Sequence, residues 1–221
     1  MPKVLYTIGY SGYALEEFLD EIKAHKISTV IDVRSVPYSQ YHSDYNKEFL
    51  AATLKSNHIH YRNYANEFGA QQKNIDFYSP EGYLDFEKFS KSEQFLSGVK
   101  KIRTGMDAGY VCTLMCAEKD PMDCHRTIMI SREFHEMGMK VVHLLPGGLQ
   151  QSQADVEERL LDHYYPNRNQ LVLFENENFS TQEYIAKAYR QKNAEIGYTG
   201  GGDEHDDIYN RVHAKNRTAV L

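Results

Sequence analysis

Two thiols, a carboxylate, an imidazole and a guanidinium lie within the eleven residues 116–126. They belong to Cys116, Glu118, Cys124, His125 and Arg126. The segment follows an apolar run that is typical of a buried strand, and a helical pattern follows it. Because α/β proteins bind their ligands at such strand-to-helix turns, the segment predicts a functional site.

The two thiols allow four interpretations. A thiolate at the start of a helix, beside His and Arg, has a lowered pKa and is a good nucleophile. The thiols could also form a redox pair, bind a metal ion or pack in the core, because free Cys is often buried. The run 120–123 reads as a helix N-terminus. The carboxylates of Asp120 and Asp123 would accept hydrogen bonds from the N–H groups at that helix end and would therefore oppose thiolate formation.

A zinc site would combine Cys116, Cys124 and His125 with Glu118 or a distant His. Adjacent side chains of a helix point about 100° apart, which makes Cys124 and His125 an awkward pair. The paired ligand spacing that is usual for zinc is also missing. The sequence therefore predicts no metal site, and it leaves any cofactor unknown.

Arg34 and Arg126 each follow a predicted strand, where a guanidinium would bind phosphate or carboxylate. Glu118 or Asp32 would transfer protons. The alternative is that buried ion pairs, Arg34 with Asp32 or Arg126 with Glu118, only order the loops. We predict a catalytic set of Asp32, Cys116, Glu118 and Cys124, and a substrate-binding set of Gly9, Ser11, Arg34, Ser35, Ser39, His125 and Arg126.

Alternating strand and helix patterns position these residues. Strands are expected at 3–8, 28–33, 59–64, 110–115 and 140–145, and helices at 14–25, 46–57, 83–105 and 127–137. This order predicts a three-layer α/β fold, with a mostly parallel sheet and helices on both faces. Because the carboxyl ends of parallel strands share one edge, the polar segments after them should converge there.

The C-terminal part predicts a helical extension. Helices are expected at 155–164 and 181–195, an edge strand at 170–174, and a long polar loop earlier in the chain at 65–80. We therefore expect a core domain at 1–150, a packed helical extension at 151–198 and a polar tail at 199–221.

Composition limits the class of protein. The chain has 221 residues, of which 41% are hydrophobic, and three Cys, an odd number that does not suggest a secreted disulfide scaffold. A net charge of −6 does not favour non-specific nucleic-acid binding. No apolar run is long enough for a membrane span, so a cytoplasmic protein is expected.

Three motifs resemble the uncharacterised family called domain of unknown function 488. They are Thr7-Ile8-Gly9-Tyr10-Ser11, Asp32-Val33-Arg34-Ser35-Val36-Pro37-Tyr38-Ser39, and Leu114-Met115-Cys116-Ala117-Glu118 with Pro121 and Cys124-His125-Arg126. The likeness covers roughly residues 4–198 and departs at Tyr10, where many relatives carry His. The resemblance implies a site in these segments but no particular reaction.

The prediction for function is an enzyme that binds a small anionic substrate, phosphate-bearing or nucleotide-like, at the carboxyl edge of the sheet. The alternative is a non-catalytic ligand-sensing or protein-interaction module. The sequence does not indicate the oligomeric state.

Overall fold

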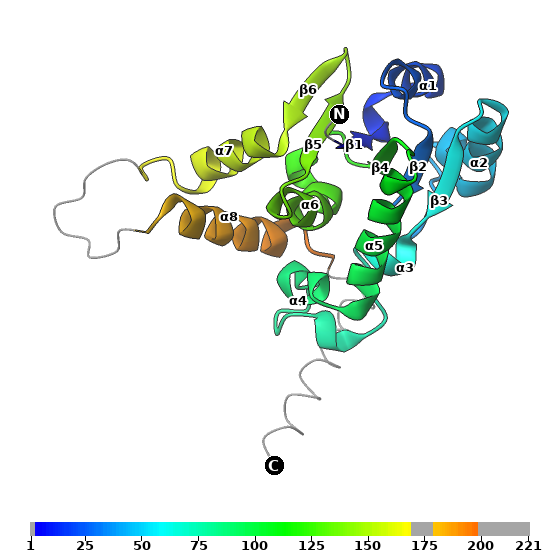
Figure 1. Ribbon diagram of the computed structural model, residues 1–221. Coiled ribbons are helices and arrows are strands. Elements are labelled where there is room, and N and C mark those ends of the chain that lie inside the picture. The colour runs from blue at the N-terminus through cyan, green and yellow to red at the C-terminus, as the bar shows by residue number, and fades with distance from the viewer. Residues whose placement is uncertain (1–2, 169–178, 199–221) are drawn as a thin grey trace.

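The structure is a computed structural model that describes residues 3–168 and 179–198 (Figure 1). The predicted edge strand at 170–174 and the polar tail lie outside the described residues. Within those residues, no helix is both long and apolar enough to cross a membrane.

A six-stranded sheet with the order β3-β2-β4-β1-β5-β6 forms the centre of the fold. All neighbouring strands are parallel except the pair β5 and β6. The strands are β1 (Val4–Gly9), β2 (Thr29–Asp32), β3 (His60–Asn63), β4 (Cys112–Cys116), β5 (Lys140–Leu145) and β6 (Leu149–Ser152). The five predicted strands are present, and β6 adds an antiparallel edge.

Helices cover both faces of the sheet, which confirms the predicted three-layer α/β fold. Helices α1 (Leu15–Ala24) and α2 (Lys47–Ser56) pack through Phe18 and Leu50 on one face. The other face carries α3 (Ala65–Phe68), α4 (Phe86–Ser90), α5 (Glu93–Asp107), α6 (Arg132–Glu136), α7 (Gln153–Tyr164) and α8 (Thr181–Ile196). Figure 1 shows α7 and α8 side by side, as the C-terminal helices. The division of the chain into 1–150 and 151–198 stays a prediction.

Alternation along the strands decides which polar side chains share a face. Cys116 packs with the core on the α5 face. Thr7 and His143 follow Leu5 and Val141 by two residues, so they project toward this face as well. Asp32 projects toward the α1 and α2 face, because Val30 packs there.

Two predicted segments differ in detail. The helix expected at 127–137 is a π-helical segment, Arg126–Ser131, followed by α6. The loop expected at 65–80 contains α3 and a single 3-10 turn at Ile75–Phe77. A wide π turn often marks a functional site, and here it begins directly after His125.

Gly9 is the point of closest approach between β1 and the loop that follows β4. A Cβ atom on Gly9 would lie 1.8 Å from the carbonyl oxygen of Glu118. The N–H of Ser11 also donates to the carbonyl of Ala117, at 3.0 Å. The glycine is therefore required by space, since its φ of −107° is open to any residue.

We expect Gly9→Ala to destabilise the protein by about 1–3 kcal/mol, because the 116–120 loop must move to admit a methyl group. Gly105→Ala is the matched control. That glycine lies in α5, a Cβ on it would meet nothing within 4 Å, and an added methyl group should stabilise the helix by about 0.5–1 kcal/mol. Urea denaturation measures both, and equal stability of Gly9→Ala and the wild type would contradict the packing argument.

Candidate functional site

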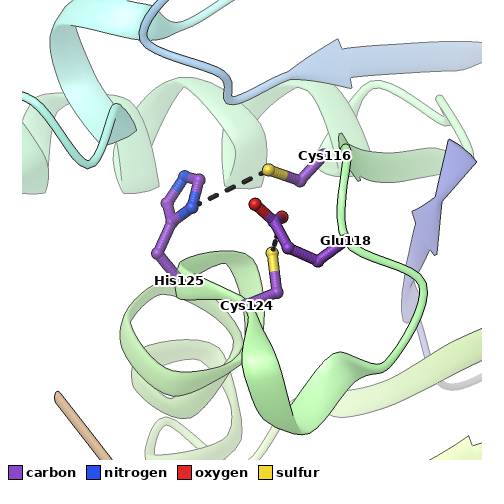
Figure 2. A group of neighbouring side chains, drawn as sticks. All are labelled: Cys116, Glu118, Cys124 and His125. Atoms are coloured by element: carbon purple, nitrogen blue, oxygen red, sulfur yellow. Dashed lines mark hydrogen bonds between the residues drawn. The ribbon is translucent and has the colours of Figure 1, made fainter. Parts of the chain in front are cut away.

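Four side chains that carry metal-ligating atoms meet at the carboxyl end of β4. The ligand atoms of Cys116, Glu118, Cys124 and His125 all lie within 4.8 Å of one another. Figure 2 shows them pointing toward a common centre from β4, from the loop that follows it and from the start of the π-helical segment. The Sγ of Cys116 is 3.7 Å from His125 Nδ1, and the Sγ of Cys124 is 2.8 Å from Glu118 Oε2.

A single turn before the π-helical segment makes this convergence possible. Asp120 caps the turn by accepting a hydrogen bond from the N–H of Met122, and the turn ends at Cys124. Cys124 is extended (φ −130°, ψ 135°), whereas His125 is already helical (φ −59°, ψ −26°). The expectation that Cys124 and His125 diverge on one helix is therefore wrong, because only His125 has helical dihedral angles.

The hydrogen bonds of His125 fix which nitrogen faces the cluster. His125 Nε2 lies 3.1 Å from the carbonyl oxygen of Val33. A carbonyl only accepts, so Nε2 carries the hydrogen and, in the neutral ring, Nδ1 presents its lone pair toward Cys116. A histidine that binds metal through one nitrogen commonly donates from the other to a backbone carbonyl.

The cluster attracts positive charge. Burial lowers the pKa of His125, but hydrogen bonding and charge from Cys124 and the charge of Glu118 outweigh it and raise this pKa. Burial raises the pKa of Glu118, yet His125 and hydrogen bonds from the two thiols bring it below its usual value.

The pKa values of the two thiols shift in opposite directions. Burial, and then Cys124, raise the pKa of Cys116 far above its usual value. Burial also raises the pKa of Cys124, but the hydrogen bond with Cys116 and the charge of Arg126 lower it overall. A Cys124 thiolate only 2.8 Å from the Glu118 carboxylate would be repelled, so a proton or a cation must lie between them.

Arg126 is fully buried beneath this loop. Its guanidinium donates to the carbonyls of Glu118 (2.7 Å) and Lys119 (3.4 Å) and to the hydroxyl of Thr7 (3.4 Å). It thus fixes the backbone of the loop and makes no hydrogen bond to the Glu118 carboxylate. Substrate binding by Arg126 stays a prediction, and a ligand would have to replace these contacts.

A chain of buried hydrogen bonds continues from Thr7 to the C-terminal helices. The Thr7 hydroxyl lies 2.8 Å from His143 Nδ1, and His143 Nε2 lies 2.9 Å from the Gln153 side-chain oxygen. Gln153 donates to the Tyr189 hydroxyl, which donates to Glu157. Because the Gln153 oxygen only accepts, His143 Nε2 carries the hydrogen and Nδ1 accepts from Thr7. Sequence reasoning missed this chain of hydrogen bonds. The contact between Thr7 and His143 follows from the strand register, which becomes known only when β1 is paired with β5.

Asp32 and Arg34 form a separate group. Arg34 donates to Asp32 from Nε (2.9 Å) and Nη2 (2.6 Å), and the Tyr61 hydroxyl donates to the same carboxylate at 2.7 Å. Arg34 also lies over the ring of Tyr10 and donates to the carbonyl of Tyr45. The buried ion pair foreseen as the alternative is present, on the opposite face from Cys116. Arg34 Nη1 has no hydrogen-bond partner among residues 3–168 and 179–198.

The predicted serines organise loops. Ser35 accepts a hydrogen bond from the N–H of Gln71, and Ser39 accepts from the N–H groups of Tyr41 and His42. Ser11 is exposed beside the 116–120 loop. The structure thus brings Cys116, Glu118, Cys124 and His125 together, while Asp32 and these serines lie outside the cluster. Substrate contacts by the serines stay predictions.

We expect Arg126→Met to lower the free energy of unfolding by about 2–4 kcal/mol, because it leaves the carbonyls of Glu118 and Lys119 without a buried donor. Arg103→Met, on the exposed side of α5, is the control and should change it by no more than about 0.5 kcal/mol. Chemical denaturation measures both variants. A loss below about 1 kcal/mol for Arg126→Met would show that the guanidinium does not hold the loop.

Acid should destabilise the protein through His143. Burial, and then the charge of Arg126, lower the pKa of this buried imidazole from 6.5 to about 3. The unfolded chain therefore binds a proton that the folded protein refuses, so stability falls as the pH drops from about 6.5 toward 3. The loss reaches up to about 1.4 kcal/mol per pH unit.

The variant His143→Gln should flatten this pH dependence, whatever its stability at pH 7. His163→Gln, exposed on α7, should retain the wild-type slope. Denaturation at pH 7, 6 and 5 measures the slope, and identical slopes for His143→Gln and the wild type would contradict the assignment.

Comparison with known proteins supports the family resemblance. No curated protein and no solved structure matches the chain. The family model described as Domain of unknown function DUF488 matches residues 14–132. This match spans more than half of the sequence and includes α1, β2, β4 and all four members of the cluster. The chain therefore belongs to the DUF488 family.

Proposed function

We propose that Cys116, Glu118, Cys124 and His125 bind one divalent transition-metal ion, best matched by zinc. We further propose that this ion is the reactive centre of an enzyme that acts on a small anionic substrate. The observation that carries the proposal is the placement of four suitable ligand atoms within reach of a single ion.

The spacing between Cys116 and His125 suits a tetrahedral ion. Zinc lies about 2.3 Å from sulfur and about 2.0 Å from nitrogen or oxygen, so ligand atoms around it are roughly 3.3–3.8 Å apart. The Cys116 sulfur and His125 Nδ1 are 3.7 Å apart. The shorter contact of 2.8 Å between Cys124 and Glu118 is a thiol hydrogen bond, and it would lengthen when a cation replaces the proton.

The ligand types favour a transition metal over a hard cation. Thiolate and imidazole ligands suit zinc, whereas calcium and magnesium prefer sites made of oxygen atoms. The ion would also neutralise the negative charge that otherwise builds up on Cys124 and Glu118. The third thiol, Cys112, lies at the other end of β4 from Cys116, and burial raises its pKa to about 11.

The cluster also supports catalysis. A bound ion would polarise a substrate oxygen as a Lewis acid, while Arg126 holds the backbone of the loop that carries Glu118. A zinc ion with four permanent protein ligands would instead be structural. That arrangement corresponds to the alternative of a non-catalytic module.

Metal content tests the proposal directly. We expect the wild type to bind about one equivalent of zinc, and its cobalt form to show thiolate-to-cobalt charge-transfer absorption. Cys116→Ala should lower the zinc affinity by more than roughly a hundredfold in a competition with a chromogenic chelator. Loss of a direct ligand should cost more than loss of a residue that only supports a ligand. Cys112→Ala is the matched control, because it removes a buried thiol from the same strand and the same side of the sheet.

Equal zinc affinity of Cys116→Ala and Cys112→Ala would overturn the metal assignment. A metal-free wild type in which mild oxidation links Cys116 to Cys124 would also overturn it, in favour of a redox pair.

A further inference from the structure

We infer that Glu118 is the exchangeable ligand of the proposed metal ion, and that an organic anion takes its place from a cavity beside Lys119. This inference rests on the metal centre proposed above. It adds the direction from which a substrate enters and the chemical class of that substrate.

Exposure separates Glu118 from the other three ligands. Cys116, Cys124 and His125 are 2%, 1% and 7% exposed, whereas Glu118 is an exposed residue. The buried three therefore close the inner side of the site. Among the four ligands, Glu118 is the residue that is exposed to solvent.

Glu118 also differs from the other ligands in how firmly its side chain is held. The ring of His125 is held by the Val33 carbonyl, and Cys116 lies within the β4 ladder, opposite Gly9. In the part of the chain that the structure describes, the Glu118 carboxylate has no lysine, arginine or amide side chain bonded to it, and Arg126 bonds its backbone carbonyl instead. A ligand without such support exchanges most readily.

A cavity of about 580 Å³ lies on this exposed side, between the 118–123 segment and the β5–β6 hairpin. Leu145, Pro146 and Leu149 form an apolar wall, and Leu149 remains 65% exposed. This volume is sufficient for a small organic molecule. The apolar wall suits a ligand with a hydrophobic body.

Two of the acidic residues that line the cavity are paired with basic residues of the protein. Asp120 is paired with Arg159 at 2.6 Å, and Asp123 is paired with Lys192 at 2.7 Å. Lys119 also lines the cavity. Its ammonium group has no hydrogen bond or ion pair among the described residues.

Lys119 is therefore the cation available to a ligand whose anionic oxygen replaces Glu118 on the metal. In this exchange one metal–oxygen bond breaks and another forms, with no redox change. The ligand class is an organic carboxylate or phosphate with a small apolar group.

Cobalt-substituted protein provides the test. We would titrate it with benzoate and with phenyl phosphate and follow the visible d–d absorption of cobalt. Saturable binding of either anion is expected. Lys119→Met should weaken it by about tenfold, the size of a charge-assisted hydrogen bond. Lys55→Met, exposed on α2 on the opposite face of the sheet, is the control and should bind like the wild type.

Glu118→Gln should change anion affinity in the opposite direction to Lys119→Met. A neutral amide is a weaker ligand than a carboxylate and repels an incoming anion less, so this variant should bind the anion severalfold more tightly. A merely structural Glu118 would give no such gain.

The two proposals fail in different ways. A wild type without charge-transfer absorption rejects the metal centre itself. Charge-transfer absorption with d–d bands that neither anion alters leaves the metal centre intact and overturns the exchange of Glu118. Unchanged or weaker anion binding by Glu118→Gln, or unchanged binding by Lys119→Met, also overturns it.

Discussion

The burial of one permanent cation shapes the whole carboxyl edge of this sheet. Arginine stays charged in proteins, so the completely buried guanidinium of Arg126 requires strong acceptors on all sides. Burial lowers its pKa, but the charges of Cys124, Cys116 and Glu118 outweigh burial and raise it. The carbonyls of Glu118 and Lys119 turn inward to meet the guanidinium. That turn brings the loop against Gly9, where no other side chain would fit.

The same cation connects the site to the C-terminal helices. Arg126 donates to Thr7, and the chain then runs through His143 to Gln153 and on to α8. His143 can take part only as the neutral ring, because both of its nitrogens are committed and a positive charge would face Arg126. The helices after β5 therefore help to set the hydrogen bonds beneath the cluster, although they lie far from it in the sequence.

The sequence was informative where local pattern and chain order decide the structure. Apolar runs bounded by turns identify β1, β2, β4 and β5, and the order of elements places their ends at one edge. The antiparallel strand β6 was not predicted, because Leu149–Ser152 has no apolar alternation and the turn before it depends on Gly147 and Gly148 with positive φ.

The residue types at 116–126 identified the cluster, but not its geometry. The conformation of Cys124 depends on a single capped turn, and spacing on an ideal helix misrepresents it. Asp32 and Arg34 converge on the same edge, but strand alternation, which chain order does not reveal, turns them to the opposite face.

Charge balance links the cluster, the cation beneath it and the class of substrate. Two thiolates and one carboxylate carry three negative charges, and a divalent ion together with Arg126 would carry three positive ones, so the site filled as proposed would be neutral. Without an ion, the same groups remain neutral overall only by keeping two protons, one of which lies in the thiol hydrogen bond from Cys124 to Glu118. A neutral ligand that displaced Glu118 would leave a net positive charge in a buried site, which is costly. A monoanion preserves neutrality, and Lys119 would compensate the second charge of a phosphate. With the proposed metal in place, the electrostatics that bury Arg126 would therefore also favour an anion as its partner.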